Sequence, residues 1–326
     1  MQPIEGLDLY KSTVFYQHQQ SGNLLIQDED RVAFLQRQTT NDLRQLTAGQ
    51  TQVSVLTSSI ARILDVLNIY IETEDVNTPA LSVLTLPSRV EQTQAYLQSR
   101  IFFMDRVRIV NVSRDHDQID LEGPAAEAVL QALGMKFPQE GALWQGKVDG
   151  YTINVLSKPG FIGNAVRLIV PKAITEILSR RLKDSGAVCL SEQSYEILRV
   201  ESGSPGAGHE LTEAYTPLEV HLNYAISDNK GCYTGQEVIA RQINFDKITR
   251  HLVGLTLEST TEEGTSLVSG STPAGTVTST VISPRFGPIA LAVVKRPFDK
   301  PGTILTVEGG DQAKARVTAL PFTHNL

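Results

Sequence analysis

Helical and strand-like patterns of apolar residues are mixed along the chain up to about residue 248. Asp28 or Asp30 is a candidate N-cap for a helix through Val32, Phe34 and Leu35. Further patterns predict helices over 89–101, 125–133, 171–183 and 192–200, and strands over 53–56, 63–71, 81–86, 107–112, 151–156 and 166–170. Because the two patterns do not alternate in strict βαβ order, they predict an α+β fold with mainly antiparallel strands.

The pattern changes from about residue 250. Short strand-like runs over 252–257, 275–282, 289–294, 303–307 and 313–319 are separated by Gly, Pro, Ser and Glu, without a helical pattern between them. Regular short strands with turn residues are typical of a small β-barrel or sandwich. We therefore predict a body over 1–247 and a C-terminal barrel domain over 248–326.

Composition restricts the partners. The chain has 326 residues, 41% hydrophobic and 20% charged, with a net charge of −7. That balance disfavours stable binding of nucleic acid, which needs cations to neutralise phosphates. The pairs Arg180/Arg181 and Arg106/Arg108 are interpreted as solvated faces. Since no apolar stretch approaches spanning length, we expect no membrane partner.

Cysteine and histidine spacing limits the chemistry. Cys189 and Cys232 are the only cysteines, too few for a disulfide framework or a four-thiolate metal site. No HxxxH or HExxH spacing occurs, so we expect no metal site. The N-terminus lacks the pattern of a secretory signal. These features favour a reducing compartment: the cytoplasm, or an organelle matrix if a transit peptide has been removed.

The segment Lys230–Glu237 is the candidate site. Its sequence is KGCYTGQE. Thr234 and Glu237 have capping-box spacing, which predicts a helix beginning just after Cys232. A helix N-terminus and the nearby Lys230 ammonium would both favour a thiolate, so we expect the pKa of Cys232 to be lowered.

The glycines and the other cysteine complete this interpretation. Gly231 and Gly235 are expected to let the backbone turn tightly around Cys232. Free cysteines are most often small buried apolar residues, and Cys189 is interpreted in that way. Lys230 alone fits a surface charge and Tyr233 alone fits a core residue; only their grouping with Cys232 indicates a site.

Several motifs together resemble one family. They are Leu198-Arg199-Val200-Glu201-Ser202-Gly203, Glu210–Glu213, Thr216–Glu219, Lys230–Glu237 with Arg241, and in the N-terminal half Thr40-Asn41-Asp42 and Ile63-Leu64-Asp65. This set resembles the YgfZ-type proteins, paralogues of the glycine-cleavage T-protein (aminomethyltransferase). The resemblance implies a ring of three subdomains around a folate site, two in the body and the barrel last.

The resemblance also implies a ligand and its contacts. The ligand is tetrahydrofolate or a one-carbon-substituted folate. The implied folate contacts are Asn41, Asp65, Tyr70, Phe161, Arg167, Arg199, Glu201 and Tyr233, with Cys232 and Lys230 as the reactive pair. For Asp65, a structural role at the strand and a folate contact are equally open.

Departures from the T-protein disfavour aminomethyl transfer. The T-protein has two consecutive aspartates where this chain has Asp65 and Val66, and the second is its key catalytic acid. Valine cannot accept a proton. Arg167 aligns with a folate-contacting glutamate of the T-protein, which also has no cysteine in the segment matching Lys230–Glu237.

The function implied by the resemblance is folate-dependent support of iron–sulfur cluster assembly or repair and, through it, tRNA modification. Iron–sulfur client or assembly proteins would be transient partners, because one thiolate cannot hold a cluster alone. Whether a chemical step occurs, such as a folate-dependent transferase-like one, stays open. The alternatives are a glycine-cleavage aminomethyltransferase and a non-catalytic docking scaffold.

Overall fold

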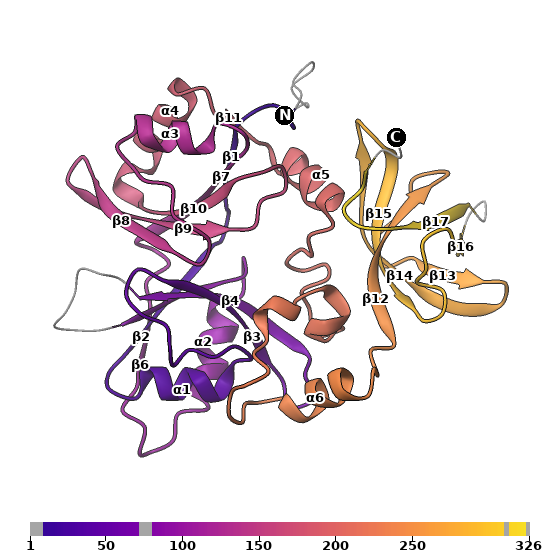
Figure 1. The fold of residues 1–326 in the computed structure, drawn as a ribbon, viewed down its shortest axis with the longest axis horizontal. Coiled ribbons are helices and arrows are strands. Elements are labelled where there is room, and N and C mark those ends of the chain that lie inside the picture. Colours follow the sequence, from indigo (N-terminus) through magenta and orange to yellow (C-terminus); the bar gives the residue numbers. More distant parts are fainter. Residues whose placement is uncertain (1–8, 72–79, 310–312, 324–326) are drawn as a thin grey trace. The chain divides into compact units, whose positions relative to one another are not determined.

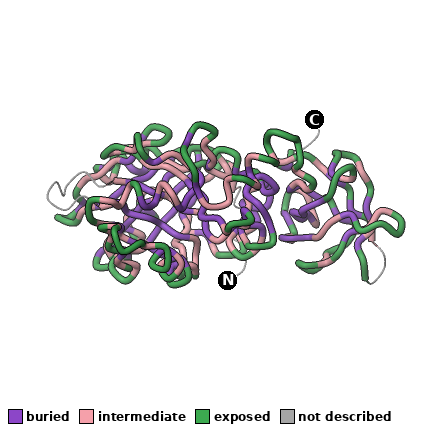
Figure 2. The backbone as a smooth tube through the Cα atoms, turned by 90° about the horizontal axis from the view of Figure 1, so that it is seen from below, coloured by how far each residue is buried: buried purple, intermediate pink, exposed green. Residues whose placement is uncertain are grey.

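The computed structural model describes residues 9–71, 80–309 and 313–323. Its strands form a six-stranded sheet, a five-stranded sheet and a closed six-stranded barrel (Figure 1). The expected α+β class with a C-terminal β-barrel is confirmed. The chain divides into two compact units, and Figure 2 shows the buried backbone inside each. Unit 1 holds Met1–Thr57, Leu64–Glu192 and Ala225–Thr234; unit 2 holds Ser58–Ile63, Gln193–Tyr224 and Gly235–Leu326. The boundary at residue 248 stays a prediction.

The five-stranded sheet of unit 1 has the order β3-β4-β5-β2-β6. Its strands are β2 (Gly22–Gln27), β3 (Thr51–Thr57), β4 (Ile63–Ile71), β5 (Leu81–Thr85) and β6 (Arg108–Asn111). The helices α1 (Arg31–Gln38) and α2 (Val90–Gln98) contribute Phe34, Leu35, Val90 and Leu97 to the apolar cluster of this sheet. Burial alternates along most of β4, as expected for a strand whose two faces differ.

The six-stranded sheet of unit 1 has the order β11-β1-β7-β10-β9-β8. Its strands are β1 (Val14–Gln17), β7 (His116–Glu122), β8 (Leu143–Val148), β9 (Tyr151–Lys158), β10 (Ala165–Pro171) and β11 (Val188–Cys189). β1 pairs in parallel with β11, whereas the ladders β7–β10, β10–β9 and β9–β8 are antiparallel. The helices α3 (Ala126–Ala132) and α4 (Thr175–Asp184), the latter preceded by a 3-10 turn (Lys172–Ile174), pack on this sheet.

Side chains from both sheets share a small apolar cluster. It contains Tyr70 and Leu84 from the five-stranded sheet and Leu143, Leu156 and Ile169 from the six-stranded sheet. All five are nearly or fully buried. This cluster joins the two sheets of unit 1, so the Tyr70 side chain of β4 lies in a packed interior.

Unit 2 combines short helices with the barrel. Its helices are α5 (Glu192–Ser202), two 3-10 turns (Pro217–Val220 and Asn223–Ala225, the latter ending at the first residue of a unit 1 segment) and α6 (Gln236–Asn244). The barrel strands are β12 (Arg250–Leu257), β13 (Ser266–Ser269), β14 (Thr272–Ser283), β15 (Gly287–Lys295), β16 (Ile304–Val307) and β17 (Lys314–Thr318). Alanine, valine and leucine side chains fill its core, as expected for a small closed barrel.

Close packing of β2 against α2 gives a test of the fold. A Cβ atom at Gly22 would lie 2.1 Å from Thr85 Oγ1 and 2.7 Å from Val90 Cβ. Gly22→Ala should therefore lower the free energy of unfolding by about 1–3 kcal/mol, because the core cannot take the added methyl group without shifting. Gly231→Ala is the matched control, since no atom lies within 4 Å of a Cβ at that position. Urea denaturation of both variants measures the difference; equal losses would contradict this packing.

Candidate functional site

The Lys230 side chain anchors the KGCYTGQE segment to the end of α1. Its Nζ donates hydrogen bonds to the carbonyl oxygens of Thr39 and, at 2.7 Å, Asn41. The same ammonium lies 5.0 Å from the centre of the Tyr233 ring, a cation–π contact. Lys230 is 6% exposed. A buried ammonium needs such acceptors to replace its water, so these contacts locate the segment on the chain that follows α1.

Further hydrogen bonds fasten the chain just before the segment and again at Thr234 within it. The Thr40 hydroxyl donates to Ala225 O at 2.6 Å, and Thr40 O accepts from Ser227 N at 3.1 Å. At the other end, Thr57 Oγ1 donates to Thr234 O at 2.6 Å, while Thr234 N donates to Arg37 O at 3.2 Å. Bonds at both ends therefore hold Cys232 in one place.

Burial changes the electrostatics of Lys230. Desolvation lowers its pKa from 10.5 to about 8, an effect that nearby Asp42 partly opposes and Arg44 reinforces. Arg44 and Gln36 in turn hold the pKa of Asp42 well below its usual range, mainly through the Arg44 side-chain hydrogen bond. Lys230 is thus a cation that burial partly disfavours, and its protons are directed at carbonyl oxygens.

The expected capping box at Thr234 is wrong. α6 begins at Gln236 with Gly235 as its N-cap, and no side-chain cap bond is made there. Gly235 has φ +85°, a left-handed conformation that turns the chain before the helix. Glu237 instead pairs with Arg241 along the helix at 2.7 Å. A Thr–Glu capping box does form in unit 2, at Thr216 and Glu219.

Cys232 is therefore presented differently from the expectation. Its thiol is exposed, whereas Cys189 is half-buried beside the apolar cluster of the six-stranded sheet. Tyr233, Thr234 and Gly235 separate Cys232 from the first residue of α6. Within the part of the chain that the structure describes, the Lys230 ammonium contacts Thr39, Asn41 and Tyr233. The geometry gives an accessible thiol on a fixed backbone, with Lys230 as the anchor of that backbone.

A polar hollow adjoins this anchored segment. Its volume is ≈ 580 Å³, within the range of small-molecule sites. Amide, hydroxyl and carboxylate side chains line it, among them Asn41, Asp42, Gln45, Gln50, Thr51, Gln52, Glu140, Ser227 and Asn229. Asn41 joins the two features, because its carbonyl oxygen accepts from Lys230 while its side chain lines the hollow.

Asp65 is a structural residue, and its interpretation as a folate contact is not supported by its position. It is fully buried, with Oδ1 accepting from the backbone of Val66 at 2.8 Å and Leu86 at 2.9 Å. Its other oxygen is hydrogen-bonded to the Thr93 hydroxyl of α2. Desolvation raises the pKa of Asp65 to about 7, although these hydrogen bonds oppose the increase. The carboxyl group therefore ties β4 and β5 to α2.

Strand alternation places the next residue on the opposite face. Val66 shares its face of β4 with Asn68 and Tyr70, and it is half-buried. Tyr70 is fully buried in the cluster between the sheets, so its ring is part of the core. The face of β4 that carries a catalytic acid in the resemblance thus presents an aliphatic side chain here.

Arg167 and Phe161 belong to an ionic cluster on the six-stranded sheet. Arg167 of β10 lies directly opposite Asp120 of β7 and donates to both oxygens of its carboxylate, at 2.7 and 2.9 Å. Lys158 Nζ is 3.3 Å from the same carboxylate and 4.9 Å from the Phe161 ring. The backbone of Phe161 donates to Glu122 at 2.7 Å.

Burial and charge in this cluster oppose each other. Asp120 is nearly buried, but the neighbouring Arg167, Lys158 and His18 hold its pKa well below its usual range despite desolvation. Desolvation raises the pKa of Glu122 and lowers that of His18. The cations are partly exposed, with Arg167 at 20% and Lys158 at 14%. This cluster can meet an anionic group from solvent.

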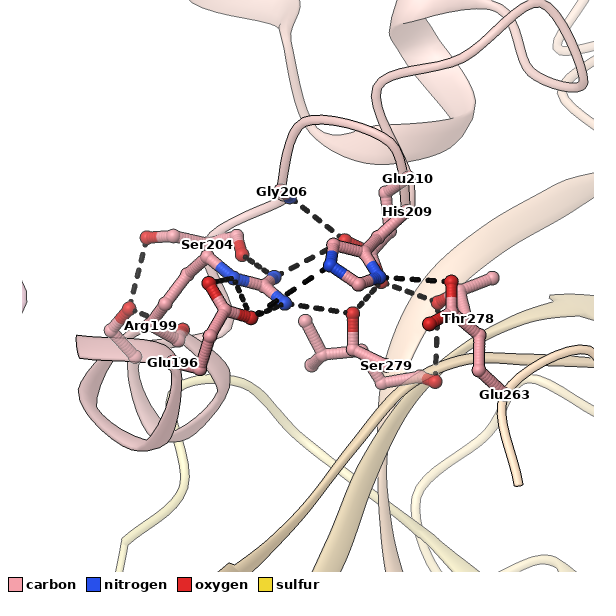
Figure 3. Close-up of polar contacts among 11 residues, drawn as sticks. Glu196, Arg199, Ser204, Gly206, His209, Glu210, Glu263, Thr278 and Ser279 are labelled. Carbon is pink, nitrogen blue, oxygen red and sulfur yellow. Dashed lines mark hydrogen bonds and ion pairs between the residues drawn. The ribbon is translucent and has the colours of Figure 1, made fainter. Parts of the chain in front are cut away.

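Arg199 lies in a buried network of unit 2 (Figure 3). Its guanidinium pairs with Glu196 at 2.6 Å and Glu210 at 3.2 Å, and donates to Ser279 at 2.9 Å. Glu210 also accepts from Thr278 and Ser279 of β14, at 2.5 and 2.6 Å. The network therefore fastens α5 and the following loop to the barrel. Arg199 is 3% exposed and its donors are engaged internally, which indicates a structural role; the implied folate contact stays a prediction.

Glu201 is also buried, at 4% exposed. It accepts from Ser283 at 2.5 Å, and desolvation raises its pKa. Its second carboxyl oxygen has no hydrogen-bond partner among residues 9–71, 80–309 and 313–323. Arg199 and Glu201, two of the implied folate contacts, therefore belong to unit 2. Lys230, Asn41, Tyr233 and Cys232 belong to unit 1.

The structure adds residues that sequence reasoning missed. Arg37, Thr40 and Thr57 hold the KGCYTGQE segment, and Lys158 and Asp120 complete the ionic cluster. Lys158 just precedes the Gly160-Phe161-Ile162-Gly163 loop, which was a usable signal. No group of three metal-ligating side chains occurs within the described ranges. No helix among the described residues has the length and hydropathy to cross a membrane.

The sheets and the barrel define a class of protein, the mixed α/β fold of the glycine cleavage T-protein. Residues 9–230 match the GCVT N-terminal domain, and residues 250–323 match the glycine cleavage T-protein C-terminal barrel domain. The chain therefore belongs to the glycine cleavage T-protein family. The solved aminomethyltransferase T of the Bartonella henselae glycine cleavage system has the same fold, with TM-score 0.84 and 21% identity over 97% of this chain and 88% of that chain.

Two relatives show the range of the similarity. A protein of Arabidopsis thaliana named "Putative transferase, chloroplastic" is 28% identical over 92% of this chain and 69% of its own length. The aminomethyltransferase of a Geobacillus species is 29% identical over 92% of this chain and 84% of its own length.

The raised pKa of Asp65 predicts a pH-dependent stability. Because the folded carboxyl group binds its proton more tightly than the unfolded one, its contribution is favourable below pH ~4 and is lost as the pH rises to about 7. The unfolding free energy of Asp65→Asn relative to wild type should therefore increase by about 2–4 kcal/mol across this window. Urea titrations at several pH values measure it, with exposed Asp184→Asn as control. A difference that stays flat with pH would contradict the buried carboxyl.

The anchoring role of Lys230 predicts a loss of stability on its removal. Lys230→Met leaves the Thr39 and Asn41 carbonyl oxygens without this donor, which should lower the free energy of unfolding by about 1–3 kcal/mol. Proteolysis should also become faster within residues 227–234. Lys136→Met, at an exposed position, is the control for both measurements. Unchanged stability and proteolysis would rule out the anchor.

Proposed function

We propose that this protein is a YgfZ-type, folate-binding member of the T-protein family that supports iron–sulfur cluster assembly or repair through Cys232. Tetrahydrofolate or a one-carbon-substituted folate is its ligand, and tRNA modification depends on its iron–sulfur clients. The carrying observation is the exposed Cys232 thiol on a backbone that Lys230, Thr40 and Thr57 hold in place. A fixed, accessible thiol can reach the reactive group of a partner, whereas a buried one cannot.

The anchoring of Lys230 refines its role in this proposal. Its ammonium donates to Thr39 and Asn41 and contacts the Tyr233 ring, so it positions the backbone of Cys232. We therefore treat Lys230 as a positioning residue and Cys232 as the reacting group. Contact with a cluster is transient, because a cluster needs about four ligands and this segment offers one thiolate.

The residues present fit folate at two places in unit 1. The polar hollow offers amides and carboxylates, such as Asn41 and Glu140, that suit the donor and acceptor edge of a pterin ring. Phe161 and the Lys158 ammonium beside it suit an aromatic ring and a carboxylate tail. Bound folate would supply the one-carbon chemistry. Asn41 would orient folate bound in the hollow, and Lys158 with Phe161 would orient it at the second place.

Two alternatives remain distinct from this proposal. An aminomethyltransferase would agree with the names of several relatives, but Val66 puts an aliphatic side chain where that reaction needs an acid. A non-catalytic scaffold would keep the fold and bind no folate. Tetrahydrofolate-dependent turnover of aminomethylated lipoyl protein by the wild type would favour the first alternative, and absence of folate affinity would favour the second.

The two cysteines provide a matched test of the thiol role. In a cell that lacks the protein, Cys232→Ala should fail to restore iron–sulfur enzyme activity and the thiolated tRNA that depends on it. Cys189→Ala, at the half-buried position, should restore both. Both purified variants should bind tetrahydrofolate as tightly as wild type, measured by titration with intrinsic fluorescence, because neither cysteine contributes to the hollow.

Each result separates one part of the proposal. Full restoration by Cys232→Ala would eliminate the thiol role while leaving folate binding in place. Lack of folate binding by the wild type would eliminate the ligand while leaving the thiol role in place.

A further inference from the structure

Figure 1 shows the loop between α2 and β6. Three consecutive apolar residues of this loop are exposed to solvent. Phe102 is 65% exposed, Phe103 98% and Met104 75%. Most large apolar side chains of unit 1 are instead packed in the clusters of its two sheets. A contiguous exposed apolar group of this kind indicates an interaction surface.

Hydrogen bonds at the base hold this apolar tip in an open position. Asp105 N donates to Phe102 O at 2.9 Å, and the Asp105 carboxylate accepts from Phe102 N at 2.9 Å. Arg37 donates to both oxygens of that carboxylate, at 2.9 and 2.8 Å. Arg106 N donates to Asp30 Oδ2 at 2.8 Å, and Asp30 N donates to Arg106 O at 3.1 Å. The loop is therefore bound to α1 at its base, and the tip does not fold back onto the sheet.

Basic residues flank the tip on both sides along the chain. Residues 100–108 carry Arg100, Arg106 and Arg108 against the single acid Asp105, in a chain whose net charge is −7. Asp105 is neutralised by Arg37, and Arg106 pairs with exposed Glu29 at 2.8 Å. Arg100 and Arg108 are exposed. With Glu29 and Asp30 counted at the base of the loop, the arginines Arg37, Arg100, Arg106 and Arg108 exceed the acids Glu29, Asp30 and Asp105 by one. This small cationic excess is opposite in sign to the chain as a whole and complements an anionic surface.

Shape and charge together select the kind of partner. Protruding apolar side chains can be buried by insertion into lipid. The interface of a bilayer accepts aromatic and aliphatic side chains in this way. Guanidinium groups beside the tip then lie at the level of the headgroups, where anionic lipid attracts them.

We propose that Phe102, Phe103 and Met104 insert into the interface of an anionic bilayer, making the protein a reversible peripheral membrane binder. This inference revises the expectation of no membrane partner, which was based on spanning length; a peripheral contact requires no spanning segment. It is independent of folate binding. Arg37 connects the loop to the candidate site, because its carbonyl oxygen accepts from Thr234 and its side chain holds Asp105.

Sedimentation with vesicles tests the insertion. The full chain should bind vesicles of phosphatidylcholine mixed with phosphatidylglycerol, and bind phosphatidylcholine vesicles more weakly. Phe103→Ser/Met104→Ser should reduce binding about tenfold or more, because the inserting side chains are removed. Phe245→Ser, 67% exposed in unit 2, is the matched control and should bind as wild type. Arg100→Gln/Arg108→Gln should reduce binding to the mixed vesicles and remove their advantage.

Fluorescence reports the depth of the tip. Phe103→Trp in a Trp144→Phe background places a single tryptophan on the loop, and its emission should shift to the blue when mixed vesicles are added. Unshifted emission, or equal binding by the serine variant and wild type, would overturn the proposal. Self-association that the serine variant abolishes, without vesicle binding by the wild type, would overturn it in favour of a protein partner.

Discussion

Burial of the Lys230 ammonium is the constraint on which the candidate site depends. A charge at 6% exposure requires acceptors in place of water, and here the carbonyl oxygens of Thr39 and Asn41, just after α1, provide them. Satisfying this charge brings residue 230 to residues 39–41. This contact also positions Cys232 and Tyr233, which follow Lys230 in the chain. The neighbouring residues Asn41, Ser227 and Asn229 line the polar hollow. Lowering of the lysine pKa to about 8 reflects the incomplete compensation.

Side chains alternate between the two faces of β4, so the adjacent residues Asp65 and Val66 have different surroundings. The Asp65 carboxyl group accepts hydrogen bonds from Val66, Leu86 and the Thr93 hydroxyl of α2. Val66 lies on the opposite face of the strand, with Asn68 and Tyr70. The acid that is present is therefore inaccessible, and the accessible position has no acid. Family membership supplies the fold, and on β4 the residue after Asp65 carries an aliphatic side chain.

Several buried charged groups in this protein are engaged with one another. Arg199 and Glu210 join α5 to the barrel, and Arg167, Lys158 and Asp120 form a cluster on the six-stranded sheet. Against that background two features of the described residues stand out as exposed: the Cys232 thiol and the apolar tip of Phe102, Phe103 and Met104. Arg37 touches the supports of both, with its carbonyl oxygen toward Thr234 and its guanidinium toward Asp105.

Periodicity alone was sufficient for the helices, for β4 and for most barrel strands, because their apolar spacing is local. It missed β7, whose His116, Asp117, Asp120 and Glu122 read as solvated although Asp120 and Glu122 are buried by pairing with residues of β9 and β10 and the loop between them. The KGCYTGQE motif likewise located the site from sequence. Only the tertiary structure showed that Lys230 anchors the segment and that the helix begins after it. Lys230 meets partners 189 and 191 residues away in sequence, the helix begins at Gln236, and Arg199, Asp65 and Tyr70 are buried, because long-range packing and desolvation have no signature in a short motif.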